Sequence, residues 1–151
     1  MENVKIKSFD IIGIAIRTTN ENEKAATDIP ALWAKFMQEN ILDKIPNKID
    51  NAIYAIYTEY EGDYTQPYTT ILGCKVSSTS NLPEGMVAKS LGGENYAKFV
   101  AKGDLTKGIV YNKWNEIWNM DLARSYSADF EIYGSKAQNP QEAEVEIFIA
   151  T

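Results

Sequence analysis

The sequence contains no histidine, and only one of its 151 residues is a cysteine, Cys74. Without histidine the chain has no Ser-His-Asp or Cys-His catalytic set, and it lacks the side chain that most often supplies a general base near neutral pH or binds zinc. A single cysteine forms no intramolecular disulfide, and because Cys74 stands in an apolar stretch we expect a buried, unreactive thiol. The sequence therefore predicts neither a bound metal nor a cofactor.

Arginine and long apolar runs are also scarce. Only Arg17 and Arg124 are arginines, and the net charge is −6, which disfavours direct nucleic-acid binding because phosphate contacts need a basic surface. The longest apolar run, residues 11–16, is far shorter than the ~20 residues of a membrane span, and the N-terminus lacks the apolar core of a signal peptide. We expect a cytoplasmic protein without membrane contact, whose partners are neutral or cationic.

The pattern of hydrophobic residues predicts nearly the same order of elements twice. In the first half we expect a strand over residues 4–18, a helix with Thr27 or Asp28 as its cap and Pro30 in its first turn, and strands over 52–60 and 68–77. In the second half we expect a strand pair, 86–91 and 96–101, around Gly92-Gly93, then a helix from about Thr106, and strands over 129–133 and 144–150. Each half has the order β-α-β-β, and one extra strand joins the halves.

This order predicts an α+β protein built as one domain, residues 1–151, with pseudo-repeats over about residues 1–80 and 84–151. Two β-α-β-β modules are expected to form one antiparallel sheet with both helices on one face. A duplicated fold of this kind leaves a groove on its pseudo-twofold axis, between the helices and over the centre of the sheet. Such a groove is a common position for a small-molecule pocket.

Aromatic side chains gather on the elements that would border this groove. The predicted helices hold Trp33, Phe36, Trp114 and Trp118. The predicted strands hold Tyr54, Tyr57, Tyr60, Phe130 and Tyr133. One interpretation is that the helical rings simply pack in the core, and the other is that they line a pocket. Tyrosine suits a wall that meets a ligand, because it offers both an apolar ring and a polar hydroxyl.

Glu131 is the most informative charged residue, because it lies in a segment that we expect to be a central strand. Side chains alternate between the two faces of a strand, so two orientations are open. If Phe130 and Ile132 face the helices, Glu131 faces water, as charged residues usually do. If Glu131 and Tyr133 face the helices, a carboxylate lies among aromatic rings, desolvation raises its pKa, and the site favours apolar cations.

Seven segments follow one another along the chain: IPALWAKF (29–36), YAIYTEY (54–60), YTTILGC (68–74), YAKFVAKG (96–103), WNEIW (114–118), DFEIY (129–133) and EIFI (146–149). In their order and spacing, these segments make the chain resemble the GyrI-like small-molecule-binding family, the effector-binding domain of AraC-type and MerR-type transcription regulators. The resemblance extends from about Phe9 to Ile149.

The resemblance implies the duplicated β-α-β-β fold and a central aromatic pocket. In family members that bind lipophilic cations, an acidic residue on the late strand is the counter-charge of the pocket, and Glu131 matches this position. Tyr57 lies on the corresponding strand of the first half and is therefore the first aromatic candidate, followed by Trp114. Weaker candidates for binding are Tyr54, Tyr133 and Phe36, and the helices add Trp33 and Trp118.

Two functions remain open from the sequence. The first is a stand-alone binding domain for amphipathic small molecules, either lipophilic cations or aromatic compounds. The second, implied by stand-alone relatives that resemble hydrolases, is a hydrolase of strained electrophilic rings, with Glu131 as general base and a tyrosine such as Tyr57 orienting the water. In neither case is a catalytic residue firmly assigned.

Interaction with another protein is a third hypothesis, in which the acidic surface mimics nucleic acid and inhibits a DNA-processing enzyme. Regulators that contain this module have a DNA-binding helix-turn-helix domain before it, whereas here the module starts near Met1. We therefore expect any regulatory action to need sequestration or a protein partner whose identity the sequence does not indicate.

Overall fold

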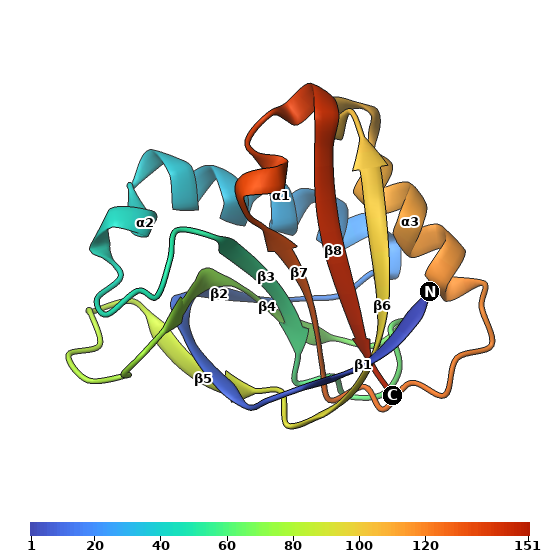
Figure 1. The fold of residues 1–151 in the computed structure, drawn as a ribbon, viewed down its shortest axis with the longest axis horizontal. Coiled ribbons are helices and arrows are strands. Elements are labelled where there is room, and N and C mark those ends of the chain that lie inside the picture. Colours follow the sequence, from blue (N-terminus) through green and yellow to red (C-terminus); the bar gives the residue numbers. More distant parts are fainter.

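The computed structural model describes residues 1–151 and has one eight-stranded antiparallel sheet with helices packed on one of its faces (Figure 1). The strands are β1 (Glu2–Ile6), β2 (Phe9–Thr18), β3 (Ile53–Thr58), β4 (Tyr68–Val76), β5 (Val87–Leu91), β6 (Glu94–Gly103), β7 (Ala128–Tyr133) and β8 (Ala143–Ala150). The helices are α1 (Lys24–Gln38), α2 (Ile41–Lys44) and α3 (Ile109–Trp118), and the short 3-10 turns are η1 (Glu21–Glu23), η2 (Leu105–Lys107), η3 (Ser135–Ala137) and η4 (Pro140–Glu142). None of the helices has the length and hydrophobicity that a membrane crossing requires.

The sheet is symmetric about its centre, because its strand order is β1-β6-β8-β7-β3-β4-β2-β5. The units β2-α1-β3-β4 and β6-α3-β7-β8 occupy equivalent places in it. Their strands β3 and β7 pair at the centre, where Ala55 is opposite Glu131. The expected α+β fold, with two β-α-β-β units in one antiparallel sheet, is confirmed, and both halves of the chain build the centre of that sheet.

The strands on either side of residues 92–93 do not pair with each other, so the predicted strand pair is wrong. Instead β5 pairs with β2, and β6 pairs with β1 and β8. The two ladders of β1 with β6 and β2 with β5 share one register, as the pairs Ile6–Glu94 and Phe9–Leu91 show. Together they form one long antiparallel ribbon that joins the two ends of the sheet.

Gly92 and Gly93 form the bend of this ribbon, which explains why a glycine pair misled the prediction of a hairpin. The Gly93 N–H donates to the carbonyl of Ile6 on the facing segment at 2.8 Å. Gly92 has a φ of 85° and lies so close to the carbonyl of Lys7 that a Cβ would be 2.6 Å from its oxygen. The glycines therefore allow a close crossing and a left-handed backbone, rather than a reversal of the chain.

A second close approach occurs between β2 and β4, where Gly13 and Gly73 are directly opposite each other. A Cβ on Gly73 would lie 2.2 Å from the carbonyl oxygen of Ile12, so a side chain there forces the backbones apart. We expect Gly73→Ala to lower the free energy of unfolding in urea by about 1–3 kcal/mol. Gly62→Ala, which meets only the flexible side chain of Gln66, should change it by less than about 0.5 kcal/mol. Equal effects of the two substitutions would contradict this account.

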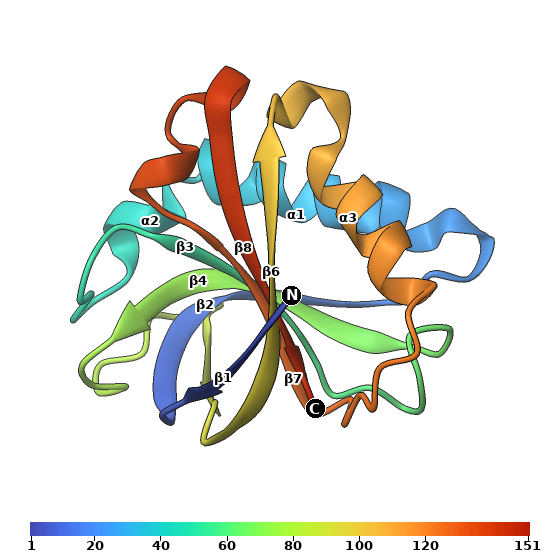
Figure 2. The same ribbon diagram turned by 45° about the vertical axis from the view of Figure 1, so that its right-hand side comes forward.

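The sheet buries apolar side chains on both of its faces. On the helix face, α1 packs with Leu32 and Phe36 over one half of the sheet, and α3 packs with Trp114 and Ile117 over the other. Figure 2 shows α1 and α3 together on this side of the sheet. The opposite face curls around a third core, which includes Phe130. Because the two helices cover separate halves, the centre of the sheet lies between them.

Cys74 is a fully buried free thiol in the core beneath α1. Burial raises its pKa to about 11, so the sulfur stays protonated at neutral pH and is a poor nucleophile. The prediction of a buried cysteine is confirmed.

The start of α1 differs from the prediction. The helix begins at Lys24, after Glu23 with its left-handed backbone (φ 58°), and Pro30 lies inside the helix rather than in its first turn. Thr27 therefore lies inside the helix and is not its cap, and the same holds for Asp28. Its carboxylate accepts a hydrogen bond from the Thr18 hydroxyl at 2.9 Å, which ties α1 to the end of β2.

Candidate functional site

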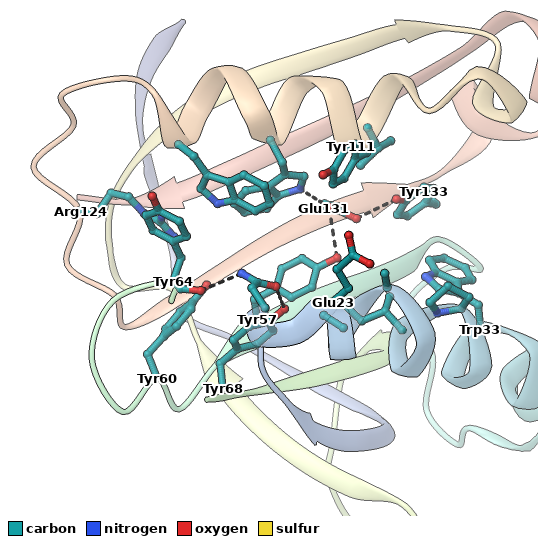
Figure 3. Close-up of a pocket in the computed structure, with 18 residues that line it drawn as sticks. Glu23, Trp33, Tyr57, Tyr60, Tyr64, Tyr68, Tyr111, Arg124, Glu131 and Tyr133 are labelled. Atoms are coloured by element: carbon teal, nitrogen blue, oxygen red, sulfur yellow. Dashed lines mark hydrogen bonds between the residues drawn. The ribbon is translucent and has the colours of Figure 1, made fainter. Parts of the chain in front are cut away.

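A cavity of about 480 Å³ opens between α1 and α3, above β3 and β7 (Figure 3). All three tryptophans of the chain and six of its nine tyrosines line this cavity. The only charged side chains in its wall are those of Glu23, Arg124 and Glu131. An aromatic wall with few charges suits an organic ligand that has apolar surface and a small number of polar groups.

The direction of the β7 side chains determines which charged groups lie on the cavity side. Phe130 points to the face of the sheet opposite the helices, where it packs against Tyr96 and Phe148. Its neighbours Asp129 and Glu131 therefore face the helices, and Glu131 is only 1% exposed. Of the two orientations that the sequence left open, the structure has the one in which Glu131 lies among aromatic rings.

Three hydrogen-bond donors surround the Glu131 carboxylate. The Trp114 Nε1–H donates to Oε2 at 2.5 Å, and the Tyr57 hydroxyl donates to the same oxygen at 3.2 Å. The Tyr133 hydroxyl donates to Oε1 at 2.7 Å. Because these donors come from α3, β3 and β7, both halves of the chain fix the position of the carboxylate (Figure 3).

Glu131 forms no ion pair with any lysine or arginine of the chain, so its charge is balanced only by hydrogen bonds. Burial raises the pKa of Glu131, and the hydrogen bonds from Tyr133, Trp114 and Tyr57 oppose this shift. Burial and the nearby Glu131 also raise the pKa of the Tyr57 and Tyr133 hydroxyls well above the ordinary value, so both tyrosines remain donors. A cation that entered the cavity would meet a carboxylate that folding has already desolvated.

A second buried ionic group borders the cavity. The side chains of Arg124 and Asp129, 5% and 0% exposed, form an ion pair in which Nη2 and Oδ2 are 2.8 Å apart. The Tyr60 hydroxyl donates to the same Oδ2 at 2.6 Å, and the Ala150 N–H donates to Oδ1 at 2.8 Å. Because this pair is internally neutral, Glu131 is the unbalanced charge of the cavity interior.

The structure brings six of the eight predicted binding residues together around the cavity. These are Trp33, Tyr57, Trp114, Trp118, Glu131 and Tyr133.

Tyr54 and Phe36 do not reach the cavity, and these two assignments are corrected. Tyr54 faces the other side of the sheet and packs against Phe9 and Phe130, because side chains three residues apart on one strand point in opposite directions. Phe36 is 1% exposed and, with Leu32, forms the face of α1 that packs against the sheet.

Tyr60, one of the three tyrosines that the sequence places close together on a strand, also lines the cavity. The sequence did not single out other side chains of the wall, among them Tyr64, Tyr68, Tyr111 and Arg124. Tyr64 comes from the loop between β3 and β4 and stacks on Trp118, with ring centroids 5.5 Å apart and an interplanar angle of 11°. Loop residues have no periodicity from which a side-chain direction can be predicted. The face of Asp129, which pairs with Arg124, follows from that of Glu131, because the two residues are two positions apart on β7.

The chemistry that this arrangement offers is electrostatic and aromatic recognition. Cations are attracted to the faces of tryptophan and tyrosine rings, most strongly where water is excluded. A desolvated carboxylate adds an opposite charge at a fixed point. No three histidine, cysteine, aspartate or glutamate side chains come together as a metal-binding group.

Comparison with known proteins places the chain among effector-binding proteins. A family profile described as "Cass2: Integron-associated effector binding protein" matches residues 4–151. YobU of Bacillus subtilis (strain 168), named as a candidate transcriptional regulator, is 31% identical over 142 residues, which cover 91% of this chain and 89% of YobU. The integron cassette protein VCH_CASS2, from the mobile metagenome of Vibrio cholerae, has a crystal structure that matches with a TM-score of 0.76 and 32% identity over 99% of this chain and 94% of that chain. SAV2435, whose structure has tetraphenylphosphonium bound, matches in fold with a TM-score of 0.80 at 15% identity, over 99% of this chain and 92% of that chain.

Proposed function

The chain belongs to the Cass2 family of integron-associated effector-binding proteins, and from this premise we propose that its effector is an amphipathic cation held in the aromatic cavity with Glu131 as counter-charge. The family match and the relatives show that the chain is a small-molecule effector-binding domain with a GyrI-like fold. The resemblance to the GyrI-like family is thereby confirmed.

The observation that supports the cationic ligand most directly is the state of Glu131. The carboxylate is buried and accepts three hydrogen bonds, but no positive side chain pairs with it. A buried charge without a counter-ion is costly for the empty protein. A ligand that brings the missing positive charge relieves this cost, so the cavity favours a cation over a neutral molecule of the same shape.

Tetraphenylphosphonium is a suitable probe for this proposal. It is the ligand in the structure of SAV2435, which shares the fold. The ion is permanently charged and surrounded by aromatic rings, so it tests the charge and the aromatic wall together, and its own charge does not change with pH.

The alternative function, hydrolysis, requires Glu131 to act as a general base as well as to carry a charge. A general base must accept a proton from a water within hydrogen-bond reach. The Glu131 carboxylate already accepts bonds from Trp114, Tyr57 and Tyr133, which occupy three of its about four acceptor positions. Recognition of a cation needs only the charge of this group, so its geometry favours binding over hydrolysis.

The proposal is tested by titrating the protein with tetraphenylphosphonium while intrinsic tryptophan fluorescence is recorded. All three tryptophans line the cavity, so an occupant changes the emission. We expect saturable quenching, and an uncharged analogue such as tetraphenylmethane or triphenylphosphine oxide should bind much more weakly. Equal binding of the charged and uncharged compounds, or no binding of either, would refute the proposal.

Two tyrosines of β3 provide a matched test of the cavity wall, because Tyr57 lines it and Tyr54 lies on the other face of the sheet. Tyr57→Phe removes one hydrogen bond to Glu131, so we expect its affinity for tetraphenylphosphonium to change by about three- to tenfold. Tyr54→Phe should leave the dissociation constant unchanged. Calorimetric titration of both variants measures this difference, and a larger effect of Tyr54→Phe would show that the wall is wrongly assigned.

A further inference from the structure

Arg124 has donors that the protein leaves unused. An arginine presents five N–H groups in one plane and often gives two of them to a single carboxylate. Here Nη2 donates to Oδ2 of Asp129, while the N–H of Ala150 donates to the other oxygen of that carboxylate. Nε and Nη1 of Arg124 are buried and have no hydrogen-bond partner in the chain. Buried donors without a partner are unfavourable, so these two nitrogens, which carry three N–H groups, need an explanation.

The aromatic neighbours of Arg124 do not replace the missing acceptor. The ring of Tyr126 is 4.3 Å from the guanidinium carbon, and the ring of Tyr64 is 5.9 Å from it. Such contacts are attractions between a positive charge and a ring face, and they provide no oxygen for an N–H. Arg124 is therefore held in place by its ion pair and by packing, and two of its donor nitrogens, Nε and Nη1, have no acceptor.

The position of Arg124 connects these donors with the ligand cavity. Its side chain belongs to the cavity wall, and Figure 3 shows it beside Tyr64 at the end of the cavity away from Trp33, with Glu131 between the two ends. Tyr64 is the aromatic neighbour of Arg124 that also lines the cavity. It lies in the loop between β3 and β4 and is only partly buried. Because Nε and Nη1 are buried, access of a ligand group to them requires the Tyr64 ring to turn aside.

The charges of the cavity define which group would fit there. Arg124 and Asp129 form a neutral pair, whereas Glu131 is unbalanced. An anionic ligand group would gain a bond from Arg124, but it would be repelled by Glu131 and Asp129 at low dielectric. A neutral oxygen, such as the carbonyl of an ester, amide or ketone, accepts the same hydrogen bond without that repulsion.

We infer that Arg124 is a second recognition point of this cavity, and that the effector is a cation bearing a neutral carbonyl oxygen that accepts a hydrogen bond from Nε or Nη1. This inference rests on the proposed function, because Glu131 has to hold the cation while Arg124 selects the oxygen. It narrows the effector class from lipophilic cations in general to those with a carbonyl at a distance from the charge.

Three dyes with one common xanthylium core test the inference. Tetramethylrosamine has an unsubstituted phenyl group, tetramethylrhodamine methyl ester adds a neutral ester to it, and tetramethylrhodamine adds a carboxylate. Dissociation constants are measured by fluorescence anisotropy with the full chain. We expect the ester to bind about tenfold more tightly than tetramethylrosamine, and the carboxylate to bind more weakly than the ester.

The wild-type protein also offers a direct observation of the hydrogen bond. Because Arg17 and Arg124 are the only arginines, the arginine side-chain N–H region of a ¹⁵N spectrum contains few signals. Arg17→Lys, at an exposed position, assigns them. The ester dye should move the Arg124 signals downfield, as a new acceptor does, and tetramethylrosamine should move them much less.

Arg124→Lys separates the fixed donors Nε and Nη1 from the positive charge, because lysine keeps a positive charge near Asp129 but loses the planar fork. We expect the ester and tetramethylrosamine to bind this variant with affinities within about twofold of each other, and thermal unfolding shows whether the variant is folded. If it is not, the wild-type spectra decide the question.

The outcomes distinguish the inference from the function on which it rests. Equal affinities of ester and tetramethylrosamine for the wild type, with unmoved Arg124 signals, would overturn the role of Arg124 and leave the cation site intact. A preference for the ester that persists in folded Arg124→Lys would overturn it as well. Failure of tetraphenylphosphonium and all three dyes to bind would reject both proposals.

Discussion

Glu131→Gln is expected to weaken the binding of tetraphenylphosphonium by about 100-fold without making the protein less stable. The substitution keeps the size of the side chain and removes its charge, so the cation enters an aromatic cavity that no longer balances it. The empty protein, by contrast, loses a buried charge without a counter-ion, whose desolvation opposes folding. Lost affinity together with unchanged or higher stability is the result expected for a buried charge that serves a ligand rather than the fold.

Calorimetric titration and urea denaturation of the same preparation measure both effects. The matched control is Glu23→Gln, because Glu23 also lines the cavity but is exposed at the start of α1. Solvent screens an exposed charge, so this variant should bind within about threefold of the wild type. If Glu131→Gln also stayed within that range, Glu131 would not be the counter-charge.

The pH dependence of binding follows from the same carboxylate. Burial raises the pKa of Glu131 in the empty protein, and a bound cation favours its charged form. As the pH falls through this raised pKa, Glu131 takes up a proton and the affinity for tetraphenylphosphonium decreases, whereas the affinity of Glu131→Gln stays flat. The stability of the empty protein changes in the opposite direction. The folded protein accommodates the protonated form of Glu131 better than its charged form. Glu131 therefore contributes stability at low pH that is lost as the pH rises through its raised pKa.

Asp129→Ala is expected to cause the largest loss of stability, about 3–5 kcal/mol in the free energy of unfolding. The substitution leaves the positive charge of Arg124 buried without a partner. It also removes the acceptor of the Tyr60 hydroxyl and of the Ala150 N–H. Because Ala150 ends β8, we expect the C-terminal strand to lose protection from hydrogen exchange before the rest of the sheet.

The other arginine provides the control for this prediction. Glu61→Ala breaks the ion pair of Arg17 with Glu61, whose side chains are 43% and 60% exposed. Exposed pairs contribute little, so the free energy of unfolding should change by less than about 1 kcal/mol. Urea denaturation of both variants compares a buried and an exposed carboxylate that each pair with an arginine. Similar losses would mean that burial does not determine the contribution of the ion pair.

The element order and the fold were predictable from the sequence because they depend on local patterns. Strand-like patterns of apolar residues predicted β2, β3, β4, β7 and β8. The helical spacing of Trp114, Ile117 and Trp118 predicted α3. The pairing of β5 and β6 was not predictable in the same way. A glycine pair is compatible with both a hairpin and a bend, and the choice depends on β1 and β2, which are about 80 residues away in the sequence.

The site was predictable where strand geometry decides it and unpredictable elsewhere. Once Phe130 is known to face the opposite core, alternation along β7 gives the direction of Glu131 and Asp129. The same rule applied between Tyr54 and Tyr57 would have removed Tyr54 from the candidates. Tyr64 and Arg124 lie outside regular elements, so their approach to the cavity is a property of the tertiary structure alone.

The bent ribbon that β1 and β2 form with β5 and β6 has a consequence for the evolution of such a protein. Each half gives a terminal strand to the other: β1 completes the ladder beside β6, and β5 completes the one beside β2. Neither half is thus a self-sufficient building block. Recombination that replaced one half alone would import a strand fitted to a different neighbour, so we expect the two halves to be inherited and diversified as a pair.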